Sequence, residues 1–174
     1  TKLALTCLMT MQGIACIYYG TEQGLDGRGD RREYAREALW GIPNAFSTGH
    51  PLYHHLHDLS QLLSEQPALR YGRQYFRKCS GNGSDFGYSP FRGGIISFSR
   101  VLNDRELLIV ANTNATETAT VHVVIDKHLN AEGKMLQILF PFDKKGPLAD
   151  ACTTHGVFRT VKVTVAADEA LVIG

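Results

Sequence analysis

An uninterrupted apolar run between two glycines constrains the fold of this chain more than any other stretch. Residues 14–19 contain only Ile, Ala, Cys and Tyr, and Gly13 and Gly20 lie on either side. A strand with one face in solvent alternates polar and apolar residues, so this run predicts a short strand covered on both faces. Residues 2–12 are mostly good helix formers and predict a helix. Helix, strand and glycine-containing loop in this order predict a βα-type unit of a parallel sheet.

The segment that follows, residues 25–47, has the composition of a solvent-exposed loop. Its first part mixes both charge signs with glycine, which is typical of a solvated connection. In folds with parallel strands, the loops at the carboxyl ends of the strands bind the ligand. Glu22 with Asp26 or Asp30 gives a candidate carboxylate pair, although no pattern fixes the separation of these groups. A plain hydrophilic connector is the alternative interpretation.

A second helix and then a series of short strands are predicted for the rest of the chain. After Pro51, leucines recur at spacings of four, three and four, the pattern of one apolar helix face: Leu52, Leu56, Leu59 and Leu63. Beyond the glycine-containing residues 79–84, short apolar or alternating segments predict an antiparallel sandwich of about 90–100 residues. The predicted strands are 95–100, 106–112, 118–126, 134–140, 158–165 and 169–173. The predicted fold class is α+β.

Composition argues against several classes of function. The net charge of +1 gives no electrostatic basis for binding nucleic acid or an anionic membrane. No apolar run reaches the roughly 20 residues of a membrane span. Residues 2–15 have the basic start and apolar centre of a secretory signal, but polar residues interrupt the run and favour a helix of the fold. The chain has no phosphate-binding loop, dinucleotide fingerprint or nucleophile elbow.

Histidine and cysteine spacing predicts neither a metal site nor a disulfide framework. Four histidines cluster at the start of the second helix, but no carboxylate or cysteine completes a ligand set: His50, His54, His55 and His57. We predict a solvated helix face there, with no metal and no cofactor. The 4 cysteines are far apart and form no C-x-x-C pair, which is typical of reduced thiols and favours a cytoplasmic location.

The run from Gly13 to Gly24 resembles the segment at the eighth barrel strand of the α-amylase family of glycoside hydrolases. Ala15 stands where proline is usual in that family. Later stretches resemble the family's arginine-to-tryptophan segment, its last barrel helix with a proline-alanine-leucine exit, and the opening strands of its C-terminal sandwich: residues 36–41, 52–72, 95–100 and 107–113. The resemblance extends over nearly the whole chain.

This resemblance implies two domains and one border of a sugar-binding cleft. Residues 1–76 would be the C-terminal remnant of a (β/α)8 catalytic barrel, and residues 77–174 the C-terminal antiparallel β-sandwich. Five residues would border the substrate cleft: Tyr18, Tyr19, Gly20, Glu22 and Arg36. Arg36 would hold a substrate-positioning carboxylate through a bidentate contact, with Arg32 as the rival candidate. An arginine that only ties the loop to the barrel rim is the alternative.

The resemblance also implies that the catalytic groups lie elsewhere. The family carries its two catalytic carboxyl groups after barrel strands four and five and a stabilising aspartate after strand seven, all of which would precede Thr1. We therefore assign no catalytic residue to this chain and expect it to be inactive alone. The parent enzyme would hydrolyse or transfer α-glucosidic bonds in starch or malto-oligosaccharides by the retaining route.

Two other functions stay open. One is a non-catalytic carbohydrate-binding or structural module that binds glucan through aromatic residues before the first clear strand: Tyr75, Phe86, Tyr88 and Phe91. The other is a non-catalytic relative of the family without the carboxylates. An isolated strand at residues 14–19 would expose unpaired edges. We therefore predict that residues 1–76 pack onto the sandwich or onto a second copy of the chain.

Overall fold

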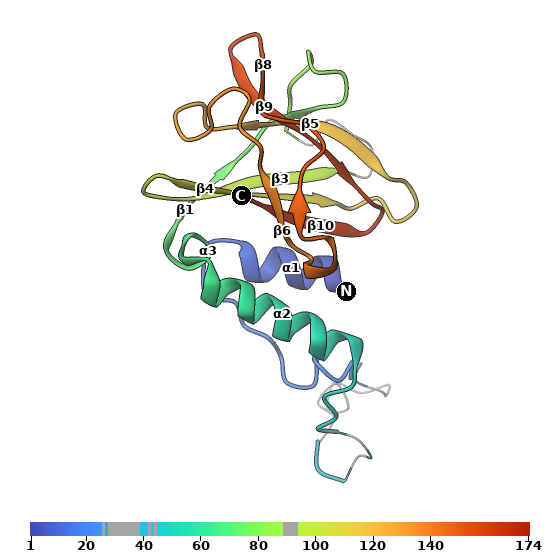
Figure 1. Ribbon diagram of the computed structural model, residues 1–174. Helices are drawn as coiled ribbons and strands as arrows, with labels where there is room; N and C mark the ends of the chain where they lie inside the picture. The colour runs from blue at the N-terminus through green and yellow to red at the C-terminus, as the bar shows by residue number, and fades with distance from the viewer. Residues whose placement is uncertain (26, 28–38, 42, 44, 89–93) are drawn as a thin grey trace.

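The computed structural model describes residues 1–25, 27, 39–41, 43, 45–88 and 94–174, which form three layers (Figure 1). One layer consists of helices: α1 (Lys2–Thr10), α2 (Pro51–Glu65) and α3 (Pro67–Tyr71). The other two layers are antiparallel sheets that pack face to face. The helices cover the outer face of one sheet, so the second sheet lies at the far side of the molecule from α2.

The sheet next to the helices has the strand order β1-β3-β4-β10-β6-β7. Its strands are β1 (Arg73–Phe76), β3 (Ile95–Leu102), β4 (Arg105–Asn112), β6 (Gln137–Phe140), β7 (Gly146–Pro147) and β10 (Glu169–Ile173). A 3-10 turn, η2 (Phe142–Lys144), joins β6 to β7. The second sheet has the order β2-β5-β9-β8, from β2 (Cys79–Ser80), β5 (Ala119–Ile125), β8 (Thr153–His155) and β9 (Phe158–Val165). The predicted antiparallel sandwich is confirmed.

Strand β4 lies between two hydrophobic cores. Leu108 and Val110 belong to the core between the sheets, whereas Leu107 and Ile109 belong to the core between the first sheet and the helices. Successive side chains of a strand point to opposite faces. The continuous apolar sequence of β4 is therefore explained by cover on both faces, as expected for a central strand.

The helices bury a slightly different face from the one that the leucine spacing predicts. Leu59 and Leu62 are fully buried against the sheet, and Leu52, Leu56 and Leu63 pack at the edge of the same core. The leucine spacing therefore predicted the buried face of α2 but did not include Leu62. Because α1, α2 and α3 share this core with β3, β4 and β10, the predicted packing onto the sandwich is confirmed for the helices, whereas Ile14, Tyr18 and Tyr19 stay exposed.

A buried arginine fastens the helical layer to the sheet. Arg100 of β3 is only 1% exposed. Its Nη1 donates to the Thr10 carbonyl oxygen at 2.7 Å, and its Nη2 and Nε donate to the Gly72 carbonyl oxygen at 2.9 and 3.2 Å. These carbonyls lie at the end of α1 and at the C-cap of α3. One side chain therefore satisfies backbone acceptors at two helix ends, where intrahelical donors are lacking.

A buried carboxylate lies on the other face of the same hairpin, where Glu106 pairs with Val101, the residue after Arg100. Oε1 of Glu106 accepts hydrogen bonds from Arg77 Nη2 at 2.6 Å and from Ser99 Oγ at 2.5 Å. Oε2 accepts from the Asp126 backbone N–H at 2.8 Å and from Asn130 Nδ2 at 2.6 Å. Glu106 thereby links the first sheet to the segment that follows β5.

The prediction of a buried strand at residues 14–19 is wrong for this structure. The segment has no regular secondary structure and Ile14 is fully exposed. The chain instead leaves α1 at Gln12, whose backbone N–H donates to Gln74 Oε1 at 2.7 Å while its own Oε1 accepts from the Gln74 N–H at 3.2 Å. A strand covered on both faces needs neighbouring strands and covering layers. The described residues supply neither beside this segment.

Several short elements had no detectable sequence pattern. β2, β7 and β8 contain two or three residues each, too few to display a period of two. β1 was also missed, and it pairs with β3 in the first sheet although it lies before residue 77. The proposed domain boundary between residues 76 and 77 stays a prediction.

Candidate functional site

The loop after the apolar run is folded into consecutive turns. The carbonyl oxygen of Tyr18 accepts hydrogen bonds from the Thr21 backbone N–H at 3.2 Å and from Thr21 Oγ1 at 2.6 Å. The carbonyl oxygen of Gly20 accepts from the backbone N–H groups of Gln23 at 3.1 Å and Leu25 at 2.9 Å. Local bonds of this kind fix the loop backbone without a partner strand.

Two positions of this loop require glycine, because a neighbouring side chain lies too close to leave room for a Cβ atom. Gly20 has φ +81°, and a Cβ there would lie 2.5 Å from Leu25 Cδ1. Gly24 has φ +71°, and a Cβ there would lie 2.7 Å from His50 Cε1. Positive φ is strained for residues with a side chain. His50 is in turn the N-cap of α2, because its Nδ1 accepts from the Leu52 backbone N–H at 3.2 Å. Gly24 thus lets the loop lie directly against the start of α2.

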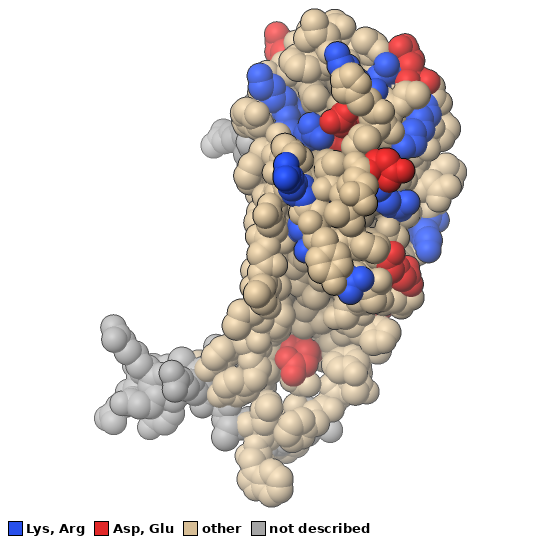
Figure 2. Space-filling model, turned by 90° about the vertical axis from the view of Figure 1, so that its left-hand side faces the viewer, with Lys and Arg blue, Asp and Glu red and all other residues tan. Residues whose placement is uncertain are grey.

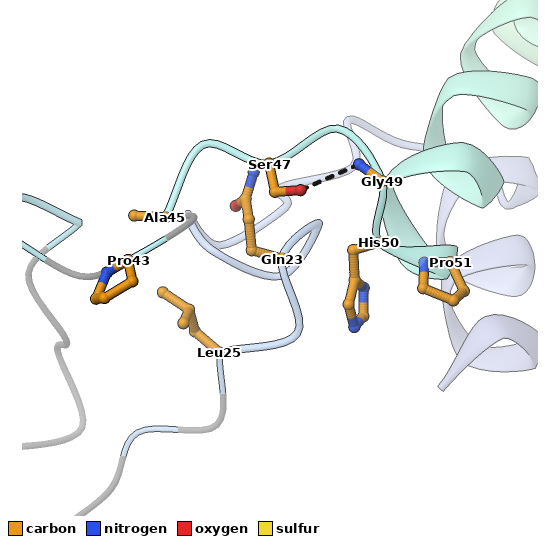
Figure 3. Close-up of a pocket in the computed structure, with 8 residues that line it drawn as sticks. All are labelled: Gln23, Leu25, Pro43, Ala45, Ser47, Gly49, His50 and Pro51. Carbon is orange, nitrogen blue, oxygen red and sulfur yellow. Dashed lines mark hydrogen bonds between the residues drawn. The ribbon is translucent and has the colours of Figure 1, made fainter.

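A cavity of about 410 Å³ lies between this loop and the start of α2 (Figure 3). Its lining consists of Gln23, Leu25, Pro43, Ala45, Ser47, Gly49, His50 and Pro51. On one side, Ser47 Oγ accepts a hydrogen bond from the Gly49 backbone N–H at 3.2 Å. Gln23 Oε1 is buried and has no hydrogen-bond partner among the described residues. The cavity therefore combines apolar walls with one unused buried acceptor, the usual make-up of a small-molecule site.

Four of the five predicted cleft residues lie in the loop beside this cavity rather than in its wall. The rings of Tyr18 and Tyr19 are 4.7 Å apart at 37°, and both side chains are exposed. Gly20 forms the turn described above, and Glu22 is half-buried. Arg36 lies outside the described residues, and so do Asp26, Asp30 and Arg32. The role of these residues at a substrate cleft stays a prediction.

The sequence pattern indicated neither the N-cap role of His50 nor the position of Gln23 in the cavity wall. A signal for His50 was present, because it directly precedes Pro51, and proline is frequent at the first position of a helix. The orphan acceptor of Gln23 results from the packing around it, and packing leaves no local sequence pattern.

The described part of the loop lacks the groups for glycosidic bond cleavage. Glycoside hydrolysis uses two carboxyl groups on opposite sides of the scissile bond. Among the described residues between 13 and 50, Glu22 is the sole carboxylate. The described residues of the loop therefore provide fewer carboxyl groups than this route requires.

Of the histidines of α2, His54 and His57 are exposed, as predicted for a solvated face, whereas His55 contacts α1. His55 Nε2 lies 3.0 Å from Thr6 Oγ1 and 3.1 Å from the Lys2 carbonyl oxygen. Burial lowers the pKa of His55, with a smaller opposing effect from the hydrogen bond to the Lys2 carbonyl. Among the described residues, no three or more His, Cys, Asp or Glu side chains form a group able to hold a metal ion.

Among the residues that the structure describes, charged side chains lie mainly on the sandwich, and Figure 2 shows Lys, Arg, Asp and Glu interspersed over the upper part of this face. Three described residues between α1 and α2 expose large apolar side chains: Ile14, Trp40 and Phe46. None of the helices in the described ranges is long and apolar enough to span a bilayer.

The chain resembles segments of known enzymes in sequence. It is 36% identical over 72 residues to a cyclomaltodextrin glucanotransferase of Paenibacillus macerans, which takes in 41% of this chain and 9% of that protein. It is 43% identical over 61 residues to alpha-amylase 1 of Lipomyces kononenkoae, which takes in 35% of this chain and 9% of that protein. The matches therefore span about a tenth of each relative's length. No family model matches the chain.

The fold has counterparts in solved structures that cover nearly the whole chain. A debranching enzyme from Nostoc punctiforme superposes with a TM-score of 0.66 and 23% identity, over 99% of this chain and 30% of that chain. The alpha-amylase from Geobacillus thermoleovorans, solved with acarbose, gives 0.67 and 20%, over 99% and 32%. The chain therefore resembles a segment of α-amylase-family enzymes in both sequence and fold. Its two sheets match the C-terminal β-sandwich of α-amylase-family proteins, whereas a barrel remnant in residues 1–76 stays a prediction.

Proposed function

We propose that the chain is the C-terminal part of an α-glucan-acting glycoside hydrolase. The parent enzyme hydrolyses or transfers α-glucosidic bonds in starch or malto-oligosaccharides by the retaining route. The catalytic carboxyl groups belong to the rest of the enzyme, and this chain supplies one border of the substrate cleft. The relatives carry the proposal, since they are named as a cyclomaltodextrin glucanotransferase and alpha-amylases.

The exposed apolar segment at residues 14–19 supports the same proposal. Its sequence has the pattern of a strand buried on both faces, but its side chains Ile14, Tyr18 and Tyr19 are exposed in this structure. In the complete enzyme, this segment would pair as the eighth barrel strand. The turn from Tyr18 to Leu25 would then lie at the carboxyl end of that strand, where barrel enzymes bind their substrates.

In this proposal the loop residues contact sugar and position the catalytic groups. Tyr18 and Tyr19 present aromatic faces, and Gly20 brings the backbone close to the cleft. Glu22 accepts sugar hydroxyl groups, and Arg36 holds a carboxylate of another barrel loop. A retaining mechanism requires the two catalytic carboxyl groups to lie about 5–5.5 Å apart, and both come from outside residues 1–174.

The test compares the complete protein with this chain alone. The gene is first read upstream of Thr1 for an Asp and a Glu at two successive strand ends and a His-Asp pair. The complete protein is then expected to release reducing sugar from soluble starch, with the α-anomer formed first in NMR spectra. Residues 1–174 alone are expected to release none. An upstream sequence without the carboxylates, or a complete protein inactive on starch and maltoheptaose, would refute the enzyme proposal.

A non-catalytic carbohydrate-binding or structural module is the second candidate. The exposed side chains of Ile14, Trp40 and Phe46 favour a protein contact, with the rest of the barrel or with a second copy of the chain. Light scattering of the chain alone distinguishes these partners. A concentration-dependent dimer that disappears in the complete protein would indicate that the barrel normally covers this surface. A monomer at every concentration would exclude the second copy.

A further inference from the structure

The sandwich carries a second cavity at the end opposite the helices. Its volume is about 360 Å³, and its lining consists of Gly83, Ser84, Phe86, His155, Gly156, Val157 and Phe158. These residues come from the loop after β2 and from the tight turn between β8 and β9. Figure 1 shows β8 and its turn at the far end of the molecule from α2. We call this cavity the distal cleft.

Aromatic rings form a continuous wall along the distal cleft. Phe86 packs against Phe158 with ring centroids 5.1 Å apart and against His155 at 6.4 Å. His155 continues the row to His122 of β5, at 4.8 Å. At the other end, Lys78 Nζ lies 5.9 Å from the centre of the Phe158 ring and 5.8 Å from that of Tyr88. Tyr88 is 64% exposed, so the row ends in an aromatic ring open to solvent.

The loop that forms the floor of the distal cleft is fixed by its own hydrogen bonds. Cys79 and Gly87 exchange two backbone bonds, of 2.9 and 3.1 Å, across the base of the loop. Ser80 Oγ accepts from the Gly83 backbone N–H at 3.1 Å. Gly83 has φ +76°, and a Cβ there would lie 3.1 Å from His155 Nδ1. Because glycine is needed for this close approach, the cleft is held in shape before any ligand binds.

A histidine beside the distal cleft has an unused hydrogen-bonding atom. His122 Nδ1 is buried and has no hydrogen-bond partner among the described residues. Burial, together with the neighbouring His155 and Lys162, lowers the pKa of His122, so its ring is neutral at neutral pH. A neutral imidazole offers one donor and one acceptor. The cleft therefore suits a ligand that combines apolar faces with hydroxyl groups.

We propose that the distal cleft is a sugar-binding subsite that holds one glucosyl unit of an α-glucan chain. The C–H face of the sugar lies against Phe86 and Phe158. The hydroxyl groups at its edge hydrogen-bond with His155 and Ser84. The identity of the sugar rests on the proposed function, whereas the aromatic wall and the buried Nδ1 of His122 stand on the geometry alone. A purely apolar ligand would leave His122 Nδ1 without a hydrogen-bond partner, which is costly for a buried polar atom.

The experiment measures maltoheptaose binding to the complete protein by the Cε1–H NMR signals of its histidines. We expect the His155 signal to shift on titration and to saturate. Phe86→Ala removes one wall and is expected to weaken this binding about tenfold, the effect of losing a central aromatic contact. Tyr71→Ala is the matched control, because Tyr71 is an exposed aromatic residue on α3, in the helical layer. It should leave the titration unchanged.

A second variant covers the case in which Phe86→Ala fails to fold. Val157 is 82% exposed at the tip of the β8–β9 turn, so Val157→Arg perturbs no core and places a long side chain at the rim of the cleft. It is expected to weaken the binding while hydrolysis of maltotriose stays at the wild-type rate. A His155 signal that does not move, or equal binding by both variants and wild type, would overturn the proposal.

The outcomes separate this inference from the proposed function. Starch hydrolysis without a shift of the His155 signal leaves the enzyme proposal intact and refutes the distal subsite. A saturable shift in a protein that is inactive on starch refutes the enzyme proposal and retains the subsite, as in a binding module.

Discussion

Replacing Arg100 with methionine tests whether one buried guanidinium holds the helical layer on the sandwich. Methionine keeps the approximate length of the side chain but removes the donors to the Thr10 and Gly72 carbonyl oxygens. Each hydrogen bond from a charged donor contributes about 1.5–3 kcal/mol. A buried carbonyl left without its donor costs about 1–3 kcal/mol. Burial lowers the pKa of Arg100, which reflects the desolvation cost of the charge, and removing that cost offsets part of the loss.

The expected net loss is about 3–5 kcal/mol, the range for breaking one side of a buried charged network. Equilibrium urea unfolding measures it. With a slope of about 2 kcal/mol/M, the midpoint should fall by about 1.5–2.5 M. Arg100→Lys should lie between wild type and Arg100→Met, because a single ammonium group reaches fewer acceptors.

Arg105→Met is the matched control for this experiment. Arg105 lies in the adjacent strand β4, is exposed, and donates from Nη2 to Gln66 Oε1 at 3.0 Å. Its replacement should change the free energy of unfolding by less than about 0.5 kcal/mol, as is usual for surface positions. A loss below about 1 kcal/mol for Arg100→Met, or equal losses for both arginines, would refute the role assigned to Arg100.

Three further predictions concern buried groups elsewhere in the chain. Glu106→Gln places an amide donor opposite other donors and should lower the free energy of unfolding by about 2–4 kcal/mol; an unchanged melting temperature would contradict the role of this carboxylate. Burial lowers the pKa values of His55 and His122 from 6.5, so the unfolded chain binds more protons below that pH. Stability should therefore be complete above about pH 6.5 and fall as the pH drops, and a urea midpoint that stays constant from about pH 8 to pH 5 would exclude this. Cys16 is exposed and Cys152 is buried with a raised pKa; Cys16 should react with a thiol reagent in the native protein and Cys152 only after unfolding, which mass spectrometry of the labelled protein checks.

The strands of the sandwich were predictable because local patterns reflect their environment directly. The run at β9 alternates, and the structure buries Val161, Val163 and Val165 while Lys162 and Thr164 face solvent. The glycine-bounded turn after residue 19 was also predictable, since Gly20 and Gly24 adopt positive φ. The distal cleft was only hinted at by Phe86 and Tyr88. Its other wall comes from β8, β9 and the turn between them, and no local pattern indicates that this turn meets the loop after β2.

The apolar run at residues 14–19 separates what sequence determines from what tertiary structure decides. Sequence determined that this segment is suited to burial, because its composition is set by the environment in which it functions. Whether it forms a strand depends on neighbouring strands, and the described residues offer none, so Ile14 lies in solvent. The burial of Arg100 is likewise decided by tertiary structure, because an arginine in a strand sequence is normally expected to be exposed. Only the approach of two helix ends gives this charge enough hydrogen-bond acceptors to be buried.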